Sequence, residues 1–332
     1  MKQYHIAVLG ATGAVGREML KILLERRFPI ASLRALASAR SAGTRIPFGS
    51  DEIRVEEATD ASFAGVDVVL GAAQADLARK FAPAIVRSGA VFIDNSSAFR
   101  MNDEFPLVVP EINPDDARKH RGIIANPNCS TIITLTAIAA LNRISPIRTL
   151  VASTYQAVSG AGAAGLMELE EQVRDYAAGK PLSANAFPYQ IAFNALPQIG
   201  SDSGNGYTTE EMKMQNEGRK ILHLPELRAT CTCVRVPVLR SHSISATIVT
   251  ERKISVAEAR AAIANAPGCK LVDDLDAKQY PMPLATSDQD LVQVGRIRED
   301  LTNENGLALF CCGDQIRKGA ATNAVQIAEL LI

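Results

Sequence analysis

The stretch HIAVLGATGAVGREMLKILLERR, residues 5–27, decides the fold of the first part of the chain. Its first six residues form an apolar run that predicts a strand. Residues 13–27 predict a helix, because their apolar side chains recur at helical spacing. Three glycines, Gly10, Gly13 and Gly16, lie where the strand passes into the helix. Such a loop lets the backbone and the helix N–H groups approach a pyrophosphate, so it indicates dinucleotide binding. The alternative is a tight strand–helix turn that holds no ligand.

The remaining pattern predicts two domains of different architecture. Up to about residue 127, short apolar runs alternate with helical segments, which is typical of a doubly wound parallel sheet. The strands are expected at 33–38, 66–73, 91–96 and 122–127. A helix is expected at 77–89, although Pro83 is unfavourable inside a helix. Beyond residue 128 there are helices at 130–142 and 165–177 and alternating strands at 229–239, 243–251, 290–300 and 306–313. We therefore expect an α+β domain with a mixed or antiparallel sheet at 128–312. Residues 1–127 should form the first domain, to which 313–332 returns with a final helix.

The composition excludes several classes of protein. The chain has 332 residues, of which 47% are hydrophobic and 21% charged, as in an ordinary soluble globular protein. The net charge of −1 gives no electrostatic reason to expect nucleic acid or a membrane surface as partner. No apolar run approaches the roughly 20 residues that span a bilayer, and the start of the chain does not resemble a signal peptide. We expect a cytoplasmic protein with six reduced cysteines, whose spacing predicts no metal site.

The second expected strand indicates which nucleotide binds. An NAD site usually has an acidic residue about 20 residues beyond the glycine loop, but no Asp or Glu lies between Glu25 and Asp51. Ser38, Arg40 and Ser41 follow that strand instead, and a guanidinium with two hydroxyls suits a 2′-phosphate. NADP is therefore favoured over NAD. The alternative is that Arg40 is a solvated loop charge.

The segment NPNCST, residues 126–131, places a cysteine at the start of a helix. Pro127 biases Asn126 towards an extended conformation, and Asn128 is a good N-cap, so Cys129 should lie in the first helical turn. There the positive end of the helix dipole favours the thiolate. Cys129 is therefore a candidate nucleophile. The alternative is a small apolar side chain that fills the junction between sheet and helix.

Six motifs follow one another over most of the chain. They are GATGAVG (10–16), SSAFR (96–100), NPNCST (126–131), TYQAVSGAG (154–162), EEMK (210–213) and RVPVLRSHS (235–243). Together they resemble aspartate-β-semialdehyde dehydrogenase, in that family's order. N-acetylglutamyl-phosphate reductases share the architecture and a cysteine nucleophile, but TYQAVSGAG and RVPV with a following histidine look more like the aspartate-semialdehyde enzyme.

The resemblance implies an activity and a mechanism. The reaction is the reversible conversion of β-aspartyl phosphate and NADPH to aspartate semialdehyde, NADP and phosphate, in the synthesis of lysine, threonine, methionine and diaminopimelate. It proceeds through a thioester on Cys129. His242 matches the acid–base histidine, and Gln156 matches the residue that orients the substrate and the bound intermediate. The family is a homodimer with a Rossmann domain and an α+β catalytic and dimerisation domain.

The substrate's charged groups have candidate partners in the same resemblance. Arg235 suits the α-carboxylate, and it should share a strand face with Cys231 and Cys233. Lys213 is assigned to phosphate and Glu210 to the substrate amine or its surroundings, with a solvated helix pair as the alternative. For Glu211 we favour the solvated interpretation, although Thr208 and Glu211 can form a capping box. The phosphate site is completed by Arg100, Asn128 and Ser97.

The remaining predictions concern the cofactor and the rival functions. A silent NADP-binding regulatory paralogue, or a plain NADP sensor, would not need Cys129, Gln156, Arg235 and His242 together. A related acyl-phosphate reductase is the rival of the same class. The residues expected at the cofactor are Gly10, Thr12, Gly13, Ala14, Val15, Gly16, Ser38, Arg40, Ser41, Ser159, Gly160, Gln315 and Asn323.

Overall fold

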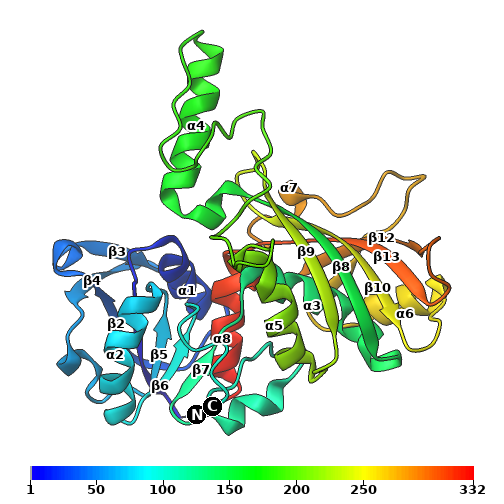
Figure 1. Ribbon diagram of the computed structural model, residues 1–332. Coiled ribbons are helices and arrows are strands. Elements are labelled where there is room, and N and C mark those ends of the chain that lie inside the picture. Colours follow the sequence, from blue (N-terminus) through cyan, green and yellow to red (C-terminus); the bar gives the residue numbers. More distant parts are fainter. Residues whose placement is uncertain (1) are drawn as a thin grey trace. The chain divides into compact units, whose positions relative to one another are not determined.

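The computed structural model describes residues 2–332 and divides the chain into two compact units (Figure 1). The first unit runs to Asn128 and takes up Gly319–Ile332, and the second is Cys129–Lys318. The strands of the first unit are β1 (Tyr4–Leu9), β2 (Ile30–Ala37), β3 (Arg45–Phe48), β4 (Asp51–Glu57), β5 (Val68–Gly71), β6 (Val91–Asp94) and β7 (Ile123–Ala125). Its helices are α1 (Ala14–Glu25), α2 (Ala75–Arg87) and α8 (Thr322–Glu329).

The first unit is a doubly wound sheet with the order β3-β4-β2-β1-β5-β6-β7. All pairs are parallel except β3 with β4, which are antiparallel. Successive residues of β1 alternate between two apolar clusters: Ile6 and Val8 pack with α1 and α8, and Ala7 and Leu9 pack with α2. Helices therefore cover both faces of the sheet, which explains why its strands read as continuous apolar runs.

The last helix belongs to the first unit. In Figure 1 the red α8 lies next to the blue α1, and it packs on α1, β5 and β6. Arg26, after α1, donates to both carboxylate oxygens of Glu329 at 2.7 Å. This bidentate pair fixes the end of α8 against the end of α1.

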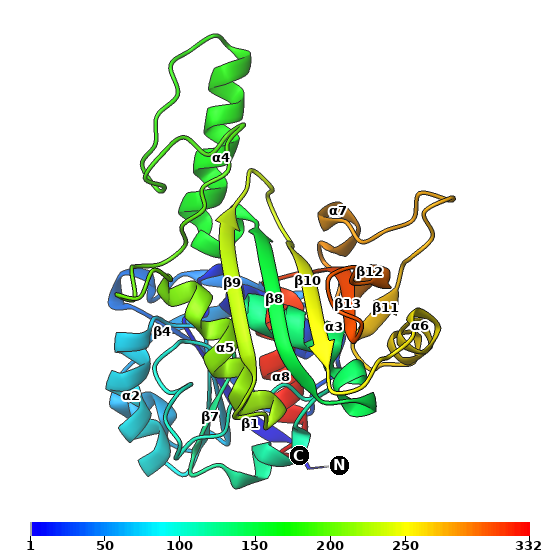
Figure 2. The same ribbon diagram turned by 45° about the vertical axis from the view of Figure 1, so that its right-hand side comes forward.

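The second unit is built on a mixed sheet with the order β11-β12-β13-β10-β8-β9. The pairs β8–β9 and β11–β12 are parallel and the other three are antiparallel. Figure 2 shows β9, β8 and β10 side by side, with α4 standing away from this sheet. Helices α3, α5 and α6 pack on one face of the sheet. The strands are β8 (Ile147–Gln156), β9 (Arg228–Arg235), β10 (His242–Thr250), β11 (Cys269–Leu271), β12 (Val292–Glu299) and β13 (Gly306–Gly313). The helices are α3 (Cys129–Ile144), α4 (Ala163–Ala177), α5 (Thr209–Leu222), α6 (Val256–Ala264) and α7 (Pro283–Thr286).

The fold class predicted from the sequence is confirmed, while several elements were missed. The strands β3, β4, β8 and β11 were not predicted. In β8 the polar residues Arg148, Thr149, Ser153 and Thr154 interrupt the apolar run, yet β8 lies between β10 and β9. Helix α2 forms in spite of Pro83, which costs it one backbone hydrogen bond. Within residues 2–332, none of the helices has the length and apolar character needed to cross a membrane.

Candidate active site

The glycine loop of the first unit is shaped for an anionic ligand. Gly10 has φ +87°, which favours glycine, and a Cβ on Gly16 would lie 2.2 Å from the Gly10 carbonyl oxygen. Helix α1 starts directly behind this turn, with Gly13 as its N-cap. Among the residues described, none caps the start of α1 through its side chain, and its first turn holds no acidic residue. The first N–H groups of α1 have no acceptor within the helix, so the loop fits a pyrophosphate.

The other cofactor candidates of this unit follow the neighbouring strand. Strand β2 pairs in parallel with β1, so the carboxyl ends of both strands lie at the same edge of the sheet. Ser38 follows β2 and precedes a short 3₁₀ helix, Ala39–Ser41. Ser38 and Arg40 are exposed and Ser41 is half-buried, as expected for groups that receive a ligand.

Arg100, which follows β6 in the chain, is buried, and two backbone carbonyls hold its guanidinium. Its Nε donates to the Asn126 carbonyl at 2.9 Å, and Nη2 donates to the Asn95 carbonyl at 2.9 Å. The side chains of Asn95 and Asn126 also hydrogen-bond to each other. The guanidinium is thus tied to the segment that leads through Asn128 to the cysteine. Ser97, by contrast, is exposed.

The candidate nucleophile opens a helix, as predicted. Helix α3 begins at Cys129, directly after Asn128, and the cysteine is half-buried. Twelve of the residues behind it in α3 are buried, so the helix is fixed by packing rather than by its own propensity. Cys129 lies close enough to Arg235 for the negative charge of its thiolate to raise the pKa of the guanidinium. The arginine in turn favours the thiolate.

Strand β8 ends in Gln156, whose amide is fully buried. The Thr154 hydroxyl donates to Gln156 Oε1 at 3.0 Å, and Gln156 Nε2 donates to Glu210 Oε1 at 3.3 Å. The other carboxylate oxygen of Glu210 accepts from Lys213 Nζ at 2.7 Å. Glu210 and Lys213 therefore share one face of α5, as their spacing predicted, and Gln156 joins this pair.

Ala157 holds two further candidates through its backbone. Its N–H donates to His242 Nδ1 at 3.1 Å, and its carbonyl accepts from Arg235 Nη1 at 2.6 Å. His242 is fully buried and opens β10, while Arg235 is 7% exposed and ends β9. Cys231, Cys233 and Arg235 are all buried on one face of β9, as the alternation predicted.

Burial changes the pKa values of His242 and Arg235. Burial, with the nearby Arg235 charge, lowers the pKa of His242 to about 3, although Glu210 and the Ser241 backbone act in the opposite direction. Burial also lowers the pKa of Arg235, whereas Cys129 and Glu210 raise it. Within residues 2–332 no carboxylate lies within ion-pair distance of the Arg235 guanidinium, and the Ala157 carbonyl is its one hydrogen-bond acceptor. A buried guanidinium with donors to spare is suited to an anionic ligand.

The SGAG segment, residues 159–162, lies beside Arg235 and His242. A Cβ on Gly160 would be 2.7 Å from Arg235 Nη1 and 3.2 Å from His242 Cε1. Gln315 bridges the neighbouring Ser159, to whose hydroxyl it donates, and Ser241, whose N–H donates to Gln315 Oε1 at 2.7 Å. Asn323 is fully buried in the first unit, where it donates to the Val108 carbonyl and to Asn126 Oδ1.

The solvated interpretation of Glu211 is wrong. Thr208 and Glu211 form the expected capping box at the start of α5. In addition, Glu211 is 8% exposed and its Oε1 accepts from the Cys233 N–H at 3.0 Å. The carboxylate therefore joins α5 to β9, two residues before Arg235. The thiols of Cys231 and Cys233 are free, with their sulfur atoms 3.8 Å apart.

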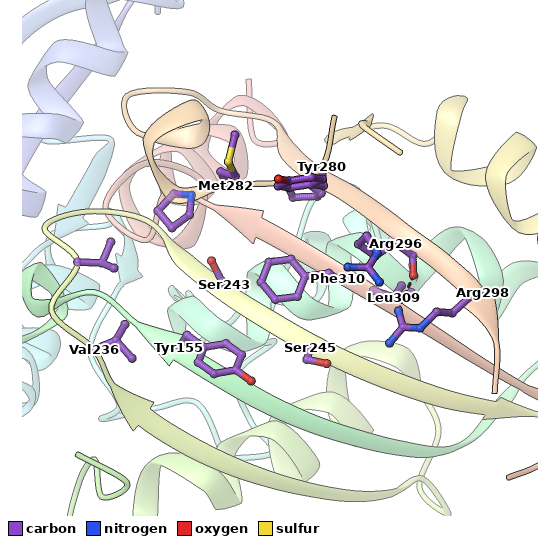
Figure 3. A pocket seen from close by; sticks show the side chains of 13 residues that line it. Tyr155, Val236, Ser243, Ser245, Tyr280, Met282, Arg296, Arg298, Leu309 and Phe310 are labelled. Carbon is purple, nitrogen blue, oxygen red and sulfur yellow. Dashed lines mark hydrogen bonds between the residues drawn. The ribbon is translucent and has the colours of Figure 1, made fainter. Parts of the chain in front are cut away.

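A pocket lies on the face of the mixed sheet that α3, α5 and α6 leave uncovered. Tyr155 precedes Gln156 in β8 and points away from α3 and α5, into a pocket of about 660 Å³ (Figure 3). Ser245 on the neighbouring strand β10 and Phe310 on β13, the strand beyond it, also line the pocket, and Tyr280 and Met282 form its far side. This pocket is separate from Gln156, Arg235 and His242, because adjacent strand residues face opposite sides of a sheet.

Comparisons with known proteins agree with both units. Residues 5–120 match the family model for the semialdehyde dehydrogenase NAD binding domain, and residues 138–318 match that for the semialdehyde dehydrogenase dimerisation domain. Aspartate-semialdehyde dehydrogenase of Synechocystis sp. is 50% identical over 328 residues, which are 99% of this chain and 97% of that protein.

The solved structures give the same result. Aspartate semialdehyde dehydrogenase II from Vibrio cholerae has a TM-score of 0.97 at 42% identity, with 99% of this chain and 98% of that chain covered. A complex of that enzyme with ASA superimposes with a TM-score of 0.97 at 41% identity, covering 100% of this chain and 98% of that chain. The resemblance seen in the motifs is confirmed, and the chain belongs to the aspartate-semialdehyde dehydrogenase family.

Proposed function

We propose that this chain is an NADP-dependent aspartate-semialdehyde dehydrogenase of the cytoplasm. It interconverts β-aspartyl phosphate and aspartate semialdehyde through a thioester on Cys129, for the synthesis of lysine, threonine, methionine and diaminopimelate. The observation that carries the proposal is the buried Arg235 guanidinium, which has donors to spare and lies within electrostatic reach of a cysteine that opens a helix. The names of relatives that match over nearly the whole chain support it.

Cys129 supplies the nucleophile. The helix dipole and the Arg235 charge both favour its thiolate, which attacks the acyl carbon of β-aspartyl phosphate. Phosphate leaves as the thioester forms. In the opposite direction the thiolate adds to the aldehyde carbon. Gln156 is proposed to orient the substrate. His242, whose Nε2 lies 3.4 Å from Gln156 Nε2, is proposed as the acid–base residue.

The substrate's charges are assigned to separate side chains. Arg235 is proposed to hold the α-carboxylate through two parallel hydrogen bonds. Lys213 is the candidate for phosphate in the second unit, and Arg100, with Asn128 and Ser97, is the candidate in the first. Glu210 is proposed to receive the substrate amine, because its carboxylate already organises Lys213 and Gln156.

The cofactor residues are proposed by the same reasoning. The loop Gly10–Gly16, with Thr12, Ala14 and Val15, would hold the pyrophosphate, and Ser38, Arg40 and Ser41 the 2′-phosphate. When bound, NADPH supplies the hydride that reduces the thioester. Ser159, Gly160, Gln315 and Asn323 are proposed for the surroundings of the nicotinamide. Of these four only Gly160 is exposed, so the others would act mainly by positioning the backbone.

The outer face of the mixed sheet is proposed as the homodimer interface. One face of this sheet is covered by α3, α5 and α6, and the other carries Val151 and Tyr155, which are 47% and 40% exposed. Apolar side chains gathered on one sheet face are typical of an interaction surface. The match to a dimerisation domain supports this proposal.

A direct assay tests the activity. Purified enzyme should reduce NADP continuously in the presence of aspartate semialdehyde only when phosphate is added, because without phosphate the reaction stops at the thioester after one turnover. A preference for N-acetylglutamate semialdehyde would identify the related acyl-phosphate reductase instead. NADP binding without turnover of either aldehyde would indicate a silent paralogue.

A further inference from the structure

The segment 183–196, which follows α4 in the chain, is fixed to that helix by the buried side chain of Gln172. Gln172 Oε1 accepts from the N–H groups of Ile191 and Ala192 at 3.0 and 2.8 Å. Its Nε2 donates to the Ser183 carbonyl at 2.7 Å. A single amide on α4 therefore holds the segment both at its start and near its end.

Glu168, one turn earlier on α4, holds the same segment between these two points. This carboxylate is also buried, and its Oε2 accepts from the N–H groups of Asn185, at 2.6 Å, and of Ala186. Its Oε1 accepts from Gln172 Nε2 at 3.2 Å. A buried carboxylate is costly without its donors, so the two N–H groups are kept in place. The backbone directly before Phe187 is thereby fixed relative to α4.

Phe187 is the side chain that this arrangement positions, and its ring lies against the guanidinium of Arg235. The Arg235 Cζ atom is 5.9 Å from the ring centroid. The tip of the ring lies 3.0 Å from the point where a Cβ on Gly165 would be, so that glycine leaves room for it. The ring also packs on the apolar cluster that contains Val158 and Leu169. Phe187 is thus held through both its backbone and its ring.

The end of the same segment holds the backbone of Arg235. The Leu196 N–H donates to the Arg235 carbonyl at 2.9 Å, and the Arg235 N–H donates to the Leu196 carbonyl at 2.8 Å. The segment therefore contacts this arginine twice, at its backbone through Leu196 and at its side chain through Phe187. Neither contact uses a guanidinium N–H group, so these donors stay available to a carboxylate.

We infer that Phe187 is a positioning residue for the carboxylate end of the substrate, and that it acts by holding the Arg235 guanidinium in place. The inference rests on the proposed function, in which Arg235 binds the α-carboxylate. A cation is attracted to the face of an aromatic ring, and more strongly where water is excluded. An acidic side chain at this place would occupy the guanidinium donors that the substrate needs, whereas a ring stabilises the cation and leaves those donors open.

Kinetics of Phe187→Leu test the inference, because leucine is apolar but has no aromatic face. Loss of the cation–π contact should raise KM for aspartate semialdehyde about five- to thirtyfold and change KM for phosphate little. Phe193→Leu is the matched control, since Phe193 lies on the same segment but contacts the Tyr176 ring, with centroids 4.5 Å apart. It should leave both KM values nearly unchanged. An unchanged KM for the aldehyde in Phe187→Leu, or an equal rise for both substrates, would overturn the inference.

Fluorinated phenylalanine at position 187 separates the electronic effect of the ring from its packing. Mono-, di- and trifluorination withdraw negative charge from the ring face step by step, while the shape of the side chain changes little. KM for aspartate semialdehyde should rise with each added fluorine. A KM that stays constant along this series would show that Phe187 only fills space, and the inference would then be wrong.

NMR without substrate separates this inference from the proposed function. In protein labelled with 15N in arginine, the ring current of Phe187 acts on the Arg235 Nε–H signal, which Arg235→Lys assigns. Phe187→Leu should shift this signal and Phe193→Leu should not. Absence of the shift would overturn the inference whichever aldehyde the enzyme uses. The shift in an enzyme that does not turn over aspartate semialdehyde would support the role of Phe187 at Arg235 and refute the assigned substrate.

Discussion

Arg235 and His242 are held by opposite sides of one residue. The Ala157 carbonyl accepts from Arg235 at 2.6 Å, and the Ala157 N–H donates to His242 at 3.1 Å. Arg235, the proposed carboxylate anchor, and His242 therefore keep a constant separation. In a substrate that is gripped at its carboxylate, this separation determines which carbon reaches Cys129.

Gly160 has no side chain, and this leaves room for the Arg235 guanidinium. Its φ lies outside the left-handed region, so alanine is allowed by conformation, but a Cβ would lie 2.7 Å from Arg235 Nη1. Gly160→Ala should displace the guanidinium and lower kcat/KM for aspartate semialdehyde about 10²-fold, with a smaller change in KM for phosphate. Gly13→Ala in the cofactor loop is the control, and it should weaken NADP instead. Unchanged use of the aldehyde by Gly160→Ala would contradict the proposed position of the carboxylate.

The two anion sites can be separated by kinetics in the phosphorylating direction. Arg235→Lys loses the second parallel hydrogen bond, so it should raise KM for aspartate semialdehyde and lower kcat. Lys213→Ala should raise KM for phosphate most. Lys220→Ala, two turns further along α5, is the control and should leave both KM values nearly unchanged. The assignment of residues would be wrong if the Arg235 variant mainly impaired phosphate, or the Lys213 variant the aldehyde.

Cofactor preference is expected to depend on Arg40. A hydrogen bond to a charged group contributes roughly 1.5–3 kcal/mol, so Arg40→Ala should reduce the preference for NADP over NAD by about tenfold or more. Arg45, exposed on β3 and 3.9 Å from Glu52, is a matched control. Its alanine variant should keep the wild-type ratio of kcat/KM values. Equal use of both cofactors by the wild type would refute the preference itself.

The sequence predicted the parts of the site that depend on residue type and spacing. The strand, glycine loop and helix at the start of the chain, the cysteine at a helix start, and the common face of Cys231, Cys233 and Arg235 each follow from local periodicity or capping. These features are found in the structure because neighbouring residues determine them.

The remaining features depend on contacts between distant segments. Ala157 acts through its backbone N–H and carbonyl, which every residue except proline has, so no side chain signals its role. Glu211 was predicted as a helix cap, but its burial depends on β9, which pairs with the unpredicted strand β8. The position of the His242 ring likewise depends on a hydrogen bond to a residue 85 positions away in the chain.

The lowered pKa of His242 predicts how the free energy of unfolding changes with acid. The folded protein leaves this ring unprotonated down to pH of about 3, whereas the unfolded chain protonates it near 6.5. Between these values the unfolded state binds the extra proton, so the free energy of unfolding falls as the pH is lowered, by up to about 1.4 kcal/mol per unit from this group.

Urea unfolding at fixed protein concentration tests this sign. His242→Gln cannot take up the proton, so its stability should decrease less steeply than that of the wild type between pH 6.5 and about 4. Parallel pH dependences in the two proteins would show that His242 has an ordinary pKa in the folded state.

The central claim is that a thioester forms on Cys129, and mass spectrometry can detect it directly. Enzyme mixed with aspartate semialdehyde and NADP, without phosphate, should accumulate the acyl-enzyme, because its second step needs phosphate. Mass spectrometry after an acid quench should find one β-aspartyl group on the peptide that contains Cys129, and adding phosphate before the quench should remove it. Cys129→Ala should bind NADP, remain folded and carry no adduct. An unmodified Cys129 in an enzyme that turns over, or a Cys129→Ala variant within about tenfold of wild-type activity, would contradict the account, since loss of the nucleophile should raise the barrier by several kcal/mol.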